Sequence, residues 1–483
     1  MSLAVNTESP NPEPTPVTLD KFRLRAEECG AITCTQEAES PTASQPGLSL
    51  TRNFIWTLGG NVVYAGCQWA IVVLLAKVAS VEIVGEYALA VAVAVPIAFL
   101  GDFKLRVLFV TDVDNKYPFR EMLGLRFIFS CLSLLMILAT CGILGYTRLT
   151  TLITLLVGTA YIVDSISDTY YGRFQRDERM DRITTSMILR TILSLTAFTL
   201  AVYVTHNLLW AVCGLAVARG SVLLLYDARI GAQVWDAAAY ANGSFLLRNR
   251  YLDAFRPSWN FRRQLRMIWI VFPLAVVALL VSVNGYVPRY LLESFRGRRE
   301  VGLYSAINYI PAACFLAVNA LGYAVFPRLS KLFAKDLAGF KVLLGKIAAV
   351  YASIGVGGVL LSVVAGRQAL TLVYRPEYAQ HLNLLRWLMI VGAVNCLTTA
   401  MQCGLTAASA FRVQVPLFVA VTGISLLGSA ILIPRMGLIG AAMAALISST
   451  VQLCVSTALV FRAMGKRSRD LKTLKSNQLE PGL

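Results

Sequence analysis

Long apolar segments recur along this chain, and they limit what it can fold into more than any other feature. About twelve of them follow one another, each separated from the next by a short polar break. Each is long enough to cross a hydrocarbon core of about 30 Å as a helix, and a helix satisfies its own backbone hydrogen bonds inside a bilayer. The segments cover residues 54–78, 84–101, 123–145, 150–170, 186–204, 207–226, 267–287, 302–326, 343–365, 381–401, 412–433 and 438–460. The sequence therefore predicts an all-α polytopic membrane protein with about twelve transmembrane helices.

The composition excludes other classes of protein. Hydrophobic residues make up 57% of the chain, charged residues only 15%, and the mean hydropathy is +0.63. A soluble protein of 483 residues could not bury that much apolar surface. A transmembrane β-barrel would show short segments of alternating polarity instead of continuous apolar runs.

A short motif occurs twice and indicates two similar halves. Val84–Tyr87 reads VGEY and opens the second long apolar segment of the first half, whereas Val301–Tyr304 reads VGLY and opens the corresponding segment of the second half. Each copy is followed by a proline inside the same segment, Pro96 and Pro311. The pattern predicts two six-helix lobes related by an axis along the membrane normal.

The chain divides into five parts on this reading. The first 50 residues are rich in proline and polar residues and cannot bury enough apolar surface to fold alone, so we expect a disordered extension, with a partner-docking tail as the alternative. A stretch rich in arginine separates the two halves. The expected parts are a cytoplasmic extension over 1–50, an N-lobe over 51–226, a basic cytoplasmic linker over 227–266, a C-lobe over 267–461, and a basic cytoplasmic tail over 462–483.

Lysine and arginine set the expected orientation. The formal net charge is +17, and most of the basic residues fall in loops that share one side of the membrane with both termini. This pattern predicts a multi-pass membrane protein with both termini in the cytoplasm. One loop on the other side dissents, because it holds Arg289, Arg296, Arg298 and Arg299.

Charged residues inside predicted spans are the strongest candidates for function. Asp164 and Asp168 share one face of the fourth segment, and Arg190 and Arg219 lie in the fifth and sixth. Such residues are costly in a bilayer and usually face a bundle interior or a watery cavity. Two interpretations stay open: internal ion pairs that fix helix packing, or the lining of a cavity for a polar, anionic substrate.

Neutral polar residues inside spans add a second set of candidates. Asn61 and Gln68 lie on one face of the first segment, Asn284 in the seventh and Asn308 in the eighth. They could form hydrogen bonds between helices, worth about 0.6 kcal/mol each, or contact a substrate.

Catalytic patterns are absent from the sequence. It contains no GxxxxGK[ST], GxSxG or HExxH motif, and its ten cysteines include no CxxC pair. With only two histidines as well, we expect no cofactor, no metal site, no disulfide framework and no enzymatic activity. A membrane polysaccharide polymerase or glycosyltransferase is a weaker alternative. Such an enzyme would need a large outer loop or a clustered acidic site, whereas the outer loops predicted here are mostly short.

Several segments together resemble a known family in their order and spacing. The resemblance covers about residues 50–462 and is to polysaccharide flippases, the Wzx-like O-antigen and exopolysaccharide translocases of the multidrug/oligosaccharidyl-lipid/polysaccharide superfamily. The segments that carry it are Asn61–Gln68, Val84–Ala90, Arg176–Asp181 with Ser186 and Arg190, Val287–Tyr290 with Asn284, Val301–Ala306, Phe326–Ser330 and Ile433–Ala442. The extension over 1–50 is not typical of that family, and no coupling-ion motif is evident.

The resemblance implies a two-lobed transporter that moves a polyprenyl-diphosphate-linked oligosaccharide across a bacterial inner (plasma) membrane by alternating access. Its partners would be that lipid-linked substrate, the membrane and a polysaccharide polymerase, with no nucleic acid. A multidrug exporter of the same superfamily is the main alternative. Asp164 is a candidate for ion coupling or for pairing with an arginine. The expected substrate contacts are Asn61, Gln68, Arg190, Arg219, Asn284, Arg289 and Asn308.

Overall fold

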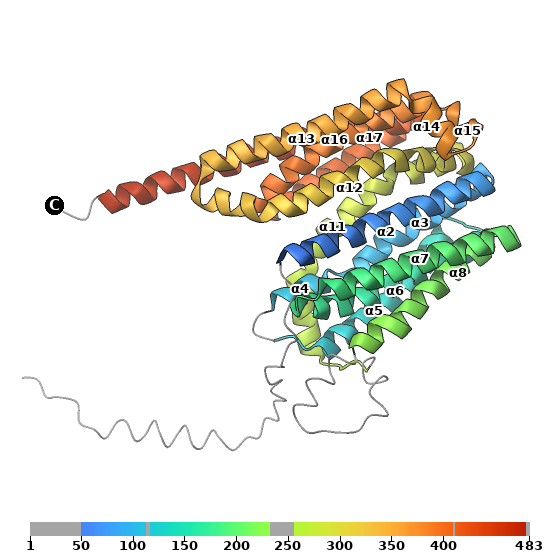
Figure 1. Cartoon of the computed structure of the whole chain (residues 1–483), viewed down its shortest axis with the longest axis horizontal. Helices are drawn as coiled ribbons and strands as arrows, with labels where there is room; N and C mark the ends of the chain where they lie inside the picture. Colours follow the sequence, from blue (N-terminus) through green and yellow to red (C-terminus); the bar gives the residue numbers. More distant parts are fainter. Residues whose placement is uncertain (1–49, 113–115, 232–255, 409–410, 480–483) are drawn as a thin grey trace, which may run out of the picture.

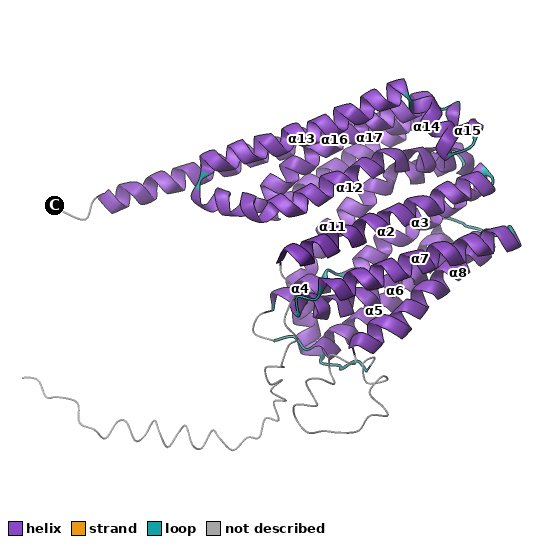
Figure 2. Ribbon diagram, in the orientation of Figure 1, coloured by secondary structure: helices purple, strands orange, loops and turns teal. Residues whose placement is uncertain are grey.

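The computed structural model describes residues 50–112, 116–231, 256–408 and 411–479, and almost all of them lie in helices (Figure 2). No strand occurs among these residues. The predicted extension over 1–50 and most of the predicted linker over 227–266 lie outside the described residues.

The first half of the chain forms one group of helices, which we call the N-lobe (Figure 1). The two predicted lobes are both present in the fold, and the residue limits predicted for each part stay a prediction. The N-lobe helices are α2 (Leu50–Val78), α3 (Val81–Asp102), α4 (Leu105–Thr111), α5 (Phe119–Ile143), α6 (Arg148–Arg176), α7 (Met180–Thr205), α8 (Leu208–Val222) and the π-helical turn η2 (Leu223–Asp227) that continues α8.

The second half forms the C-lobe. Its helices are α11 (Phe261–Arg296), α12 (Arg298–Lys335), α13 (Leu337–Val364), α14 (Gly366–Val373), α15 (Pro376–Ala379), α16 (Leu382–Ala407) and α17 (Phe411–Leu479). Non-helical φ and ψ at Gly437 divide α17 into two helices. Ten helices among the described residues are long and apolar enough to cross a membrane. If α17 is counted as two helices divided at Gly437, and α12 is added, the number of spans is twelve, as predicted.

The helices run back and forth between two faces of the molecule. We call the face that holds the start of α2 and the end of α17 the terminal face, and the face that holds α14 and α15 the far face (Figure 1). Large apolar side chains point outward from many helices; Leu135 is 63% exposed and Val217 65%. Extended exposed apolar surface of this kind suits contact with lipid tails rather than water.

Buried apolar residues form three clusters, and their distribution shows how the lobes meet. The first cluster lies toward the far face and draws on both lobes, from Ile71 and Leu89 of the N-lobe to Leu292 and Leu388 of the C-lobe. The other two lie toward the terminal face, one in each lobe. The lobes therefore share a core only on the far side, and their helices diverge toward the terminal face (Figure 1).

The two copies of the VGxY motif meet at this shared core. A Cβ atom added at Gly85 would lie 2.0 Å from the carbonyl oxygen of Arg298, and one added at Gly302 would lie 2.2 Å from that of Val81. Only glycine lets the two backbones approach this closely. The repeat predicted from sequence therefore forms the crossing of α3 and α12, the corresponding second helices of the two lobes.

Helix α11 belongs to both lobes. Near its start, Gln264 donates a hydrogen bond to the carbonyl oxygen of Glu121 on α5 (3.1 Å). Met267, Val271 and Ala275 then join the terminal-side cluster of the N-lobe. Beyond that region α11 packs against α17 and α12 of the C-lobe. The seventh span thus begins on one lobe and ends on the other.

A sharp break follows α3 that sequence patterns did not predict. Phe103 and Lys104 have φ values of +47° and +51°, in the left-handed region that non-glycine residues rarely adopt. Stacking of the Phe103 ring on Phe129, with ring centres 4.3 Å apart, holds the turn. As a result Lys104 lines the cavity described below.

Candidate functional site

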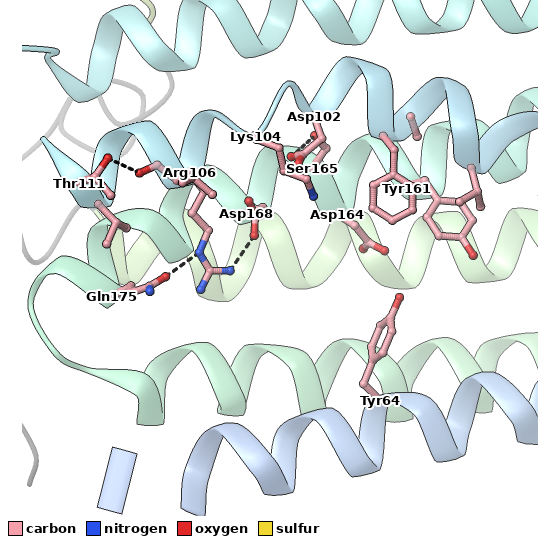
Figure 3. Close-up of a pocket in the computed structure, with 15 residues that line it drawn as sticks. Tyr64, Asp102, Lys104, Arg106, Thr111, Tyr161, Asp164, Ser165, Asp168 and Gln175 are labelled. Atoms are coloured by element: carbon pink, nitrogen blue, oxygen red, sulfur yellow. Dashed lines mark hydrogen bonds and ion pairs between the residues drawn. The ribbon is translucent and has the colours of Figure 1, made fainter. Parts of the chain in front are cut away.

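A cavity of about 710 Å³ opens in the N-lobe between α2, α3, α4 and α6 (Figure 3). It extends to the terminal ends of α4 and α6, where Thr111 and Gln175 line it. Tyr64 of α2 points across the cavity toward α6 (Figure 3). The charged side chains that line the cavity are Asp102, Lys104, Arg106, Asp164 and Asp168.

A chain of four alternating charges forms the deepest part of the site. Asp164 accepts from Arg219 with one oxygen (2.5 Å) and from Arg190 with the other (3.0 Å). Arg190 also donates to Asp227, with 2.8 Å between Nη2 and Oδ2. Both arginines are almost fully buried, at 3% and 4% exposure, while Asp164 reaches the cavity. The in-span charges predicted from sequence are therefore ion-paired, and Asp164 also lines a cavity.

Sequence reasoning missed Asp227. It lies one residue beyond the predicted sixth span, and the π-helical turn of η2 carries it inward to full burial. The number of charges did not indicate it, because the predicted spans already held two carboxylates, Asp164 and Asp168, for Arg190 and Arg219.

A second buried pair lies nearer the terminal face. Arg126 is completely buried and donates to Asp102 at both its side-chain and its backbone oxygen, each at 2.7 Å. Ser165 and Thr169 of α6 accept from the same guanidinium. Sequence reasoning overlooked Arg126, although a charge inside the apolar run 123–145 was a usable signal.

Basic residues at the mouth of this cavity are less enclosed. Arg106 donates to Asp168 and to Gln175, both at 2.8 Å. Lys104 lies 3.7 Å from Asp102. Their side chains retain 27% and 30% exposure, so both can reach a ligand without leaving the protein surface.

Arg289 differs from the arginines of the N-lobe. The sequence placed it in a loop, but α11 runs on through Pro288 to Arg296, so Arg289 lies within a membrane-spanning helix. It is 9% exposed, donates to Ser305 Oγ at 3.0 Å and lies over the Tyr286 ring at 4.8 Å. No carboxylate of the described residues lies within 4.0 Å of its guanidinium.

The neutral candidates are dispersed. Asn61 is exposed and donates to the Thr57 carbonyl oxygen of its own helix (2.9 Å). Gln68 donates to the Tyr64 hydroxyl at 3.1 Å, which places it beside the cavity. Asn308 is partly buried and makes no hydrogen bond to another described side chain, and the Oδ1 atom of Asn284 is buried without a partner. The structure therefore brings Gln68 near Asp164 and leaves Asn61 at the surface.

Tyrosines from both lobes surround these arginines. The Tyr161 ring lies 5.0 Å from the Arg219 guanidinium. The Tyr286 ring lies 4.8 Å from the Arg289 guanidinium, and Tyr64 lines the cavity together with Tyr161. Periodicity could not reveal this arrangement, because Tyr64, Tyr161 and Tyr286 come from three different helices.

Polar contacts between the lobes close the far face. Arg298 of α12 pairs with Glu86 of α3 (3.3 Å). Tyr146 donates to Glu293 of α11 at 2.5 Å. Burial and the neighbouring Glu293 carboxylate raise the pKa of the Tyr146 hydroxyl, so it stays a donor. Arg298, one of the four arginines that the charge rule did not expect on this side, therefore joins the two lobes.

Arg299 adds an exposed contact to this closure. It pairs with Glu82 of the N-lobe (3.1 Å) and with Glu377 of its own lobe. The first pair is 58% and 50% exposed, so solvent screens it strongly.

We expect Glu86→Gln to weaken the far-face closure more than Glu82→Gln. Glu86 is 14% exposed and also accepts from Thr150 (2.8 Å), whereas the Glu82 pair should contribute no more than about 0.5 kcal/mol. Thermal unfolding in detergent at low and high salt measures this. An equal loss of stability in both variants would contradict the ranking.

Comparisons with known proteins agree with this architecture. The chain is 25% identical over 406 residues to the capsular polysaccharide biosynthesis protein CapF of Staphylococcus aureus, covering 84% of this chain and 97% of the relative. Its fold is similar to an inward-facing multidrug resistance MATE family transporter of the MOP superfamily (TM-score 0.58, 14% identity, 86% and 96% of the two chains). It is equally similar to the Vibrio cholerae MATE transporter VcmN (TM-score 0.57, 14% identity, 86% and 96%).

These likenesses to solved structures show the fold alone. The family match is more direct, because residues 50–333, more than half of the chain, match the polysaccharide biosynthesis protein family. The match includes the charged cavity, Arg289 and both copies of the VGxY motif. The chain therefore belongs to the polysaccharide biosynthesis protein family.

Proposed function

We propose that this protein is a flippase that carries a polyprenyl-diphosphate-linked oligosaccharide across the membrane by alternating access. One observation carries the proposal: a charged cavity reaches the terminal face, while the core and the ion pairs that join the lobes lie at the far face, apart from the start of α11, which contacts α5. This is the arrangement expected of a transporter closed on one side. The family match supplies the context of polysaccharide biosynthesis.

The terminal face would then be cytoplasmic. This orientation follows from the predicted excess of basic residues on that side, and it places the cavity mouth where the lipid-linked substrate is made. We infer a bacterial inner membrane from the match to the polysaccharide biosynthesis protein family and to a bacterial relative. A polysaccharide polymerase on the other side would be the natural receiver of the product.

The charges suit the two chemical parts of such a substrate. Lys104 and Arg106 at the cavity mouth can pair with the diphosphate, because both keep part of their side chain exposed. The lipid tail would stay in the bilayer beside the lobes. The glycan would enter between them, toward Tyr64 and Asp164.

Asp164 remains our candidate for ion coupling. It neutralises Arg190 and Arg219 together, and it also reaches the cavity. A cation bound at Asp164, or an anion arriving from the substrate, would leave Arg219 without its carboxylate partner and Arg190 with Asp227 alone. Binding of a coupling ion or an anionic substrate would thereby change the packing of α6, α7 and α8.

Reconstitution tests the proposed function directly. Proteoliposomes would carry an undecaprenyl-diphosphate-linked oligosaccharide, and a membrane-impermeant reagent that modifies glycans would measure its exposure on each side. We expect the protein to equilibrate the substrate between leaflets. Rates equal to those of protein-free liposomes would overturn the proposal.

The double variant Arg106→Gln/Asp168→Asn tests the mouth of the cavity. It removes one positive and one negative charge together, so the helices keep their charge balance and the diphosphate loses one partner. We expect the flipping rate to fall about tenfold, the equivalent of about 1.4 kcal/mol. Arg262→Gln, an exposed arginine at the start of α11, is the matched control and should keep the full rate. A full flipping rate in the double variant would show that Arg106 does not contribute to diphosphate binding.

A further inference from the structure

Arg289 carries a buried positive charge that no described carboxylate balances. The other deeply buried arginines do not share this property, since Arg126 pairs with Asp102, Arg190 with Asp164 and Asp227, and Arg219 with Asp164. Arg289 has only Ser305 and the Tyr286 ring. An uncompensated charge in a membrane-spanning helix is costly and marks a functional position. The missing partner is therefore an anion supplied by a ligand.

The depth of Arg289 distinguishes this anion from the diphosphate at the cavity mouth. The neighbouring Tyr290 donates to the backbone oxygen of Ala92, which fixes the level of Arg289 against α3. Asp102, at the end of α3 and 3.7 Å from Lys104, follows Ala92 by ten residues, which corresponds to about 15 Å along the helix. One diphosphate cannot contact both levels. The group that reaches Arg289 while the lipid headgroup stays at the mouth belongs to the glycan.

The surroundings of Arg289 suit a sugar ring. The Tyr286 ring lies 4.8 Å from its guanidinium, and Tyr309 follows Ser305 by four residues, on the face of α12 that Arg289 contacts. Tyrosine offers an apolar face for the C–H side of a sugar and a hydroxyl for its oxygens. Val95, three residues after Ala92 on α3, lines the cavity, so the cavity reaches to within about one helical turn of the level of Arg289.

We propose that Arg289, Tyr286 and Tyr309 form a subsite for an acidic sugar, with the guanidinium pairing the sugar carboxylate. The inference rests on the proposed flippase function and adds the class of glycan. A guanidinium and a carboxylate match in a bidentate geometry. A neutral glycan would leave the charge of Arg289 buried without compensation.

Binding by the purified full-length protein in detergent tests the subsite. The probes are cellobiuronic acid, its neutral match cellobiose, and inorganic pyrophosphate, each titrated by calorimetry. We expect the wild-type chain to bind the acidic disaccharide at least tenfold more tightly than cellobiose. Arg289→Gln should abolish that difference, Arg289→Lys should keep part of it, and neither should change pyrophosphate binding.

Two outcomes would overturn the subsite. Equal affinity of the wild-type chain for cellobiuronic acid and cellobiose would contradict the preference for an acidic sugar. A loss of pyrophosphate binding in Arg289→Gln would assign Arg289 to the diphosphate instead. A second variant, Tyr309→Ala, should bind both disaccharides more weakly than the wild type, whereas the control Arg262→Gln should bind them as tightly as the wild type. Equal affinity of Tyr309→Ala and the wild type would show that Tyr309 does not contact the sugar.

Stability separates this role from a structural one. Arg289→Gln removes an uncompensated charge, so its unfolding temperature should equal or exceed that of the wild type. A fall of several degrees would make Arg289 a packing residue. The binding assay also separates the two proposals, because acidic-sugar binding without lipid flipping would refute only the transport function, and flipping without acidic-sugar preference would refute only the subsite.

Discussion

Asp164→Ala should be the most destabilising single substitution in the N-lobe. The change leaves Arg219 without a carboxylate and leaves Arg190 with Asp227 alone. Removing one partner from a buried ion pair typically costs about 3–5 kcal/mol, because the other charge stays buried and unpaired. We expect a large drop in the unfolding temperature in detergent, followed by thermal unfolding with an intrinsic fluorescence readout.

A double variant tests the cause. Replacing both members of the pair, as in Asp164→Leu/Arg219→Met, removes the orphan charge and should recover a large part of the lost stability. Asp168→Ala is the matched control on the same helix, since Asp168 is 26% exposed and its partner Arg106 reaches solvent. A loss in Asp168→Ala as great as in Asp164→Ala would show that burial of the charges does not set the cost.

Gly85→Ala and Gly302→Ala should both prevent the lobes from closing at the far face. The added methyl group would meet a backbone oxygen at 2.0 Å or 2.2 Å, and backbone atoms of a packed helix cannot move aside as a flexible side chain can. Overpacking of this kind costs about 1–3 kcal/mol. Because the cost falls only on the closed state, the population shifts toward a form open at the far face.

Spin-label distances measure this shift. Labels at Thr205 and Leu372, both exposed near the far face of opposite lobes, should move apart in either glycine variant, and the flipping rate should fall. Gly59→Ala is the control, because a Cβ atom there meets nothing within 4 Å. Unchanged distances in both variants would show that the crossing of α3 and α12 does not form the closure.

The sequence allowed much of the fold to be predicted, because each span must satisfy the bilayer by itself. Length and apolar composition therefore located the helices, and the repeated VGxY motif located the equivalent spans. In-span Asp164, Arg190 and Arg219 were correctly expected to be exceptional. The contact between the two copies of the motif depends on how the lobes pack, so the sequence of either helix alone could not predict it.

The pairing of the charged residues could not be predicted as well. Asp227 lies just beyond its predicted span and is carried inward by a π-helical turn, and Arg289 lies in a helix that continues past its apolar stretch. The left-handed turn at Phe103 and Lys104 depends on stacking with another helix. These features arise from contacts between distant segments, which no local pattern records. Whether the predicted substrate contacts bind glycan stays a prediction.

Helix α11 has a mechanical consequence. Its first turns are fixed to α5 through Gln264, and its last turns carry Arg289, pack on α12 and α17 of the C-lobe, and meet the N-lobe again at the far face through Tyr290 and Glu293. Because α11 is attached to both lobes, it has to bend when the lobes rotate against each other. Pro273 and Pro288 each remove a hydrogen bond from this helix and give it a place to bend. Elastic energy stored in α11 would thus link the occupancy of Arg289 to the angle between the lobes.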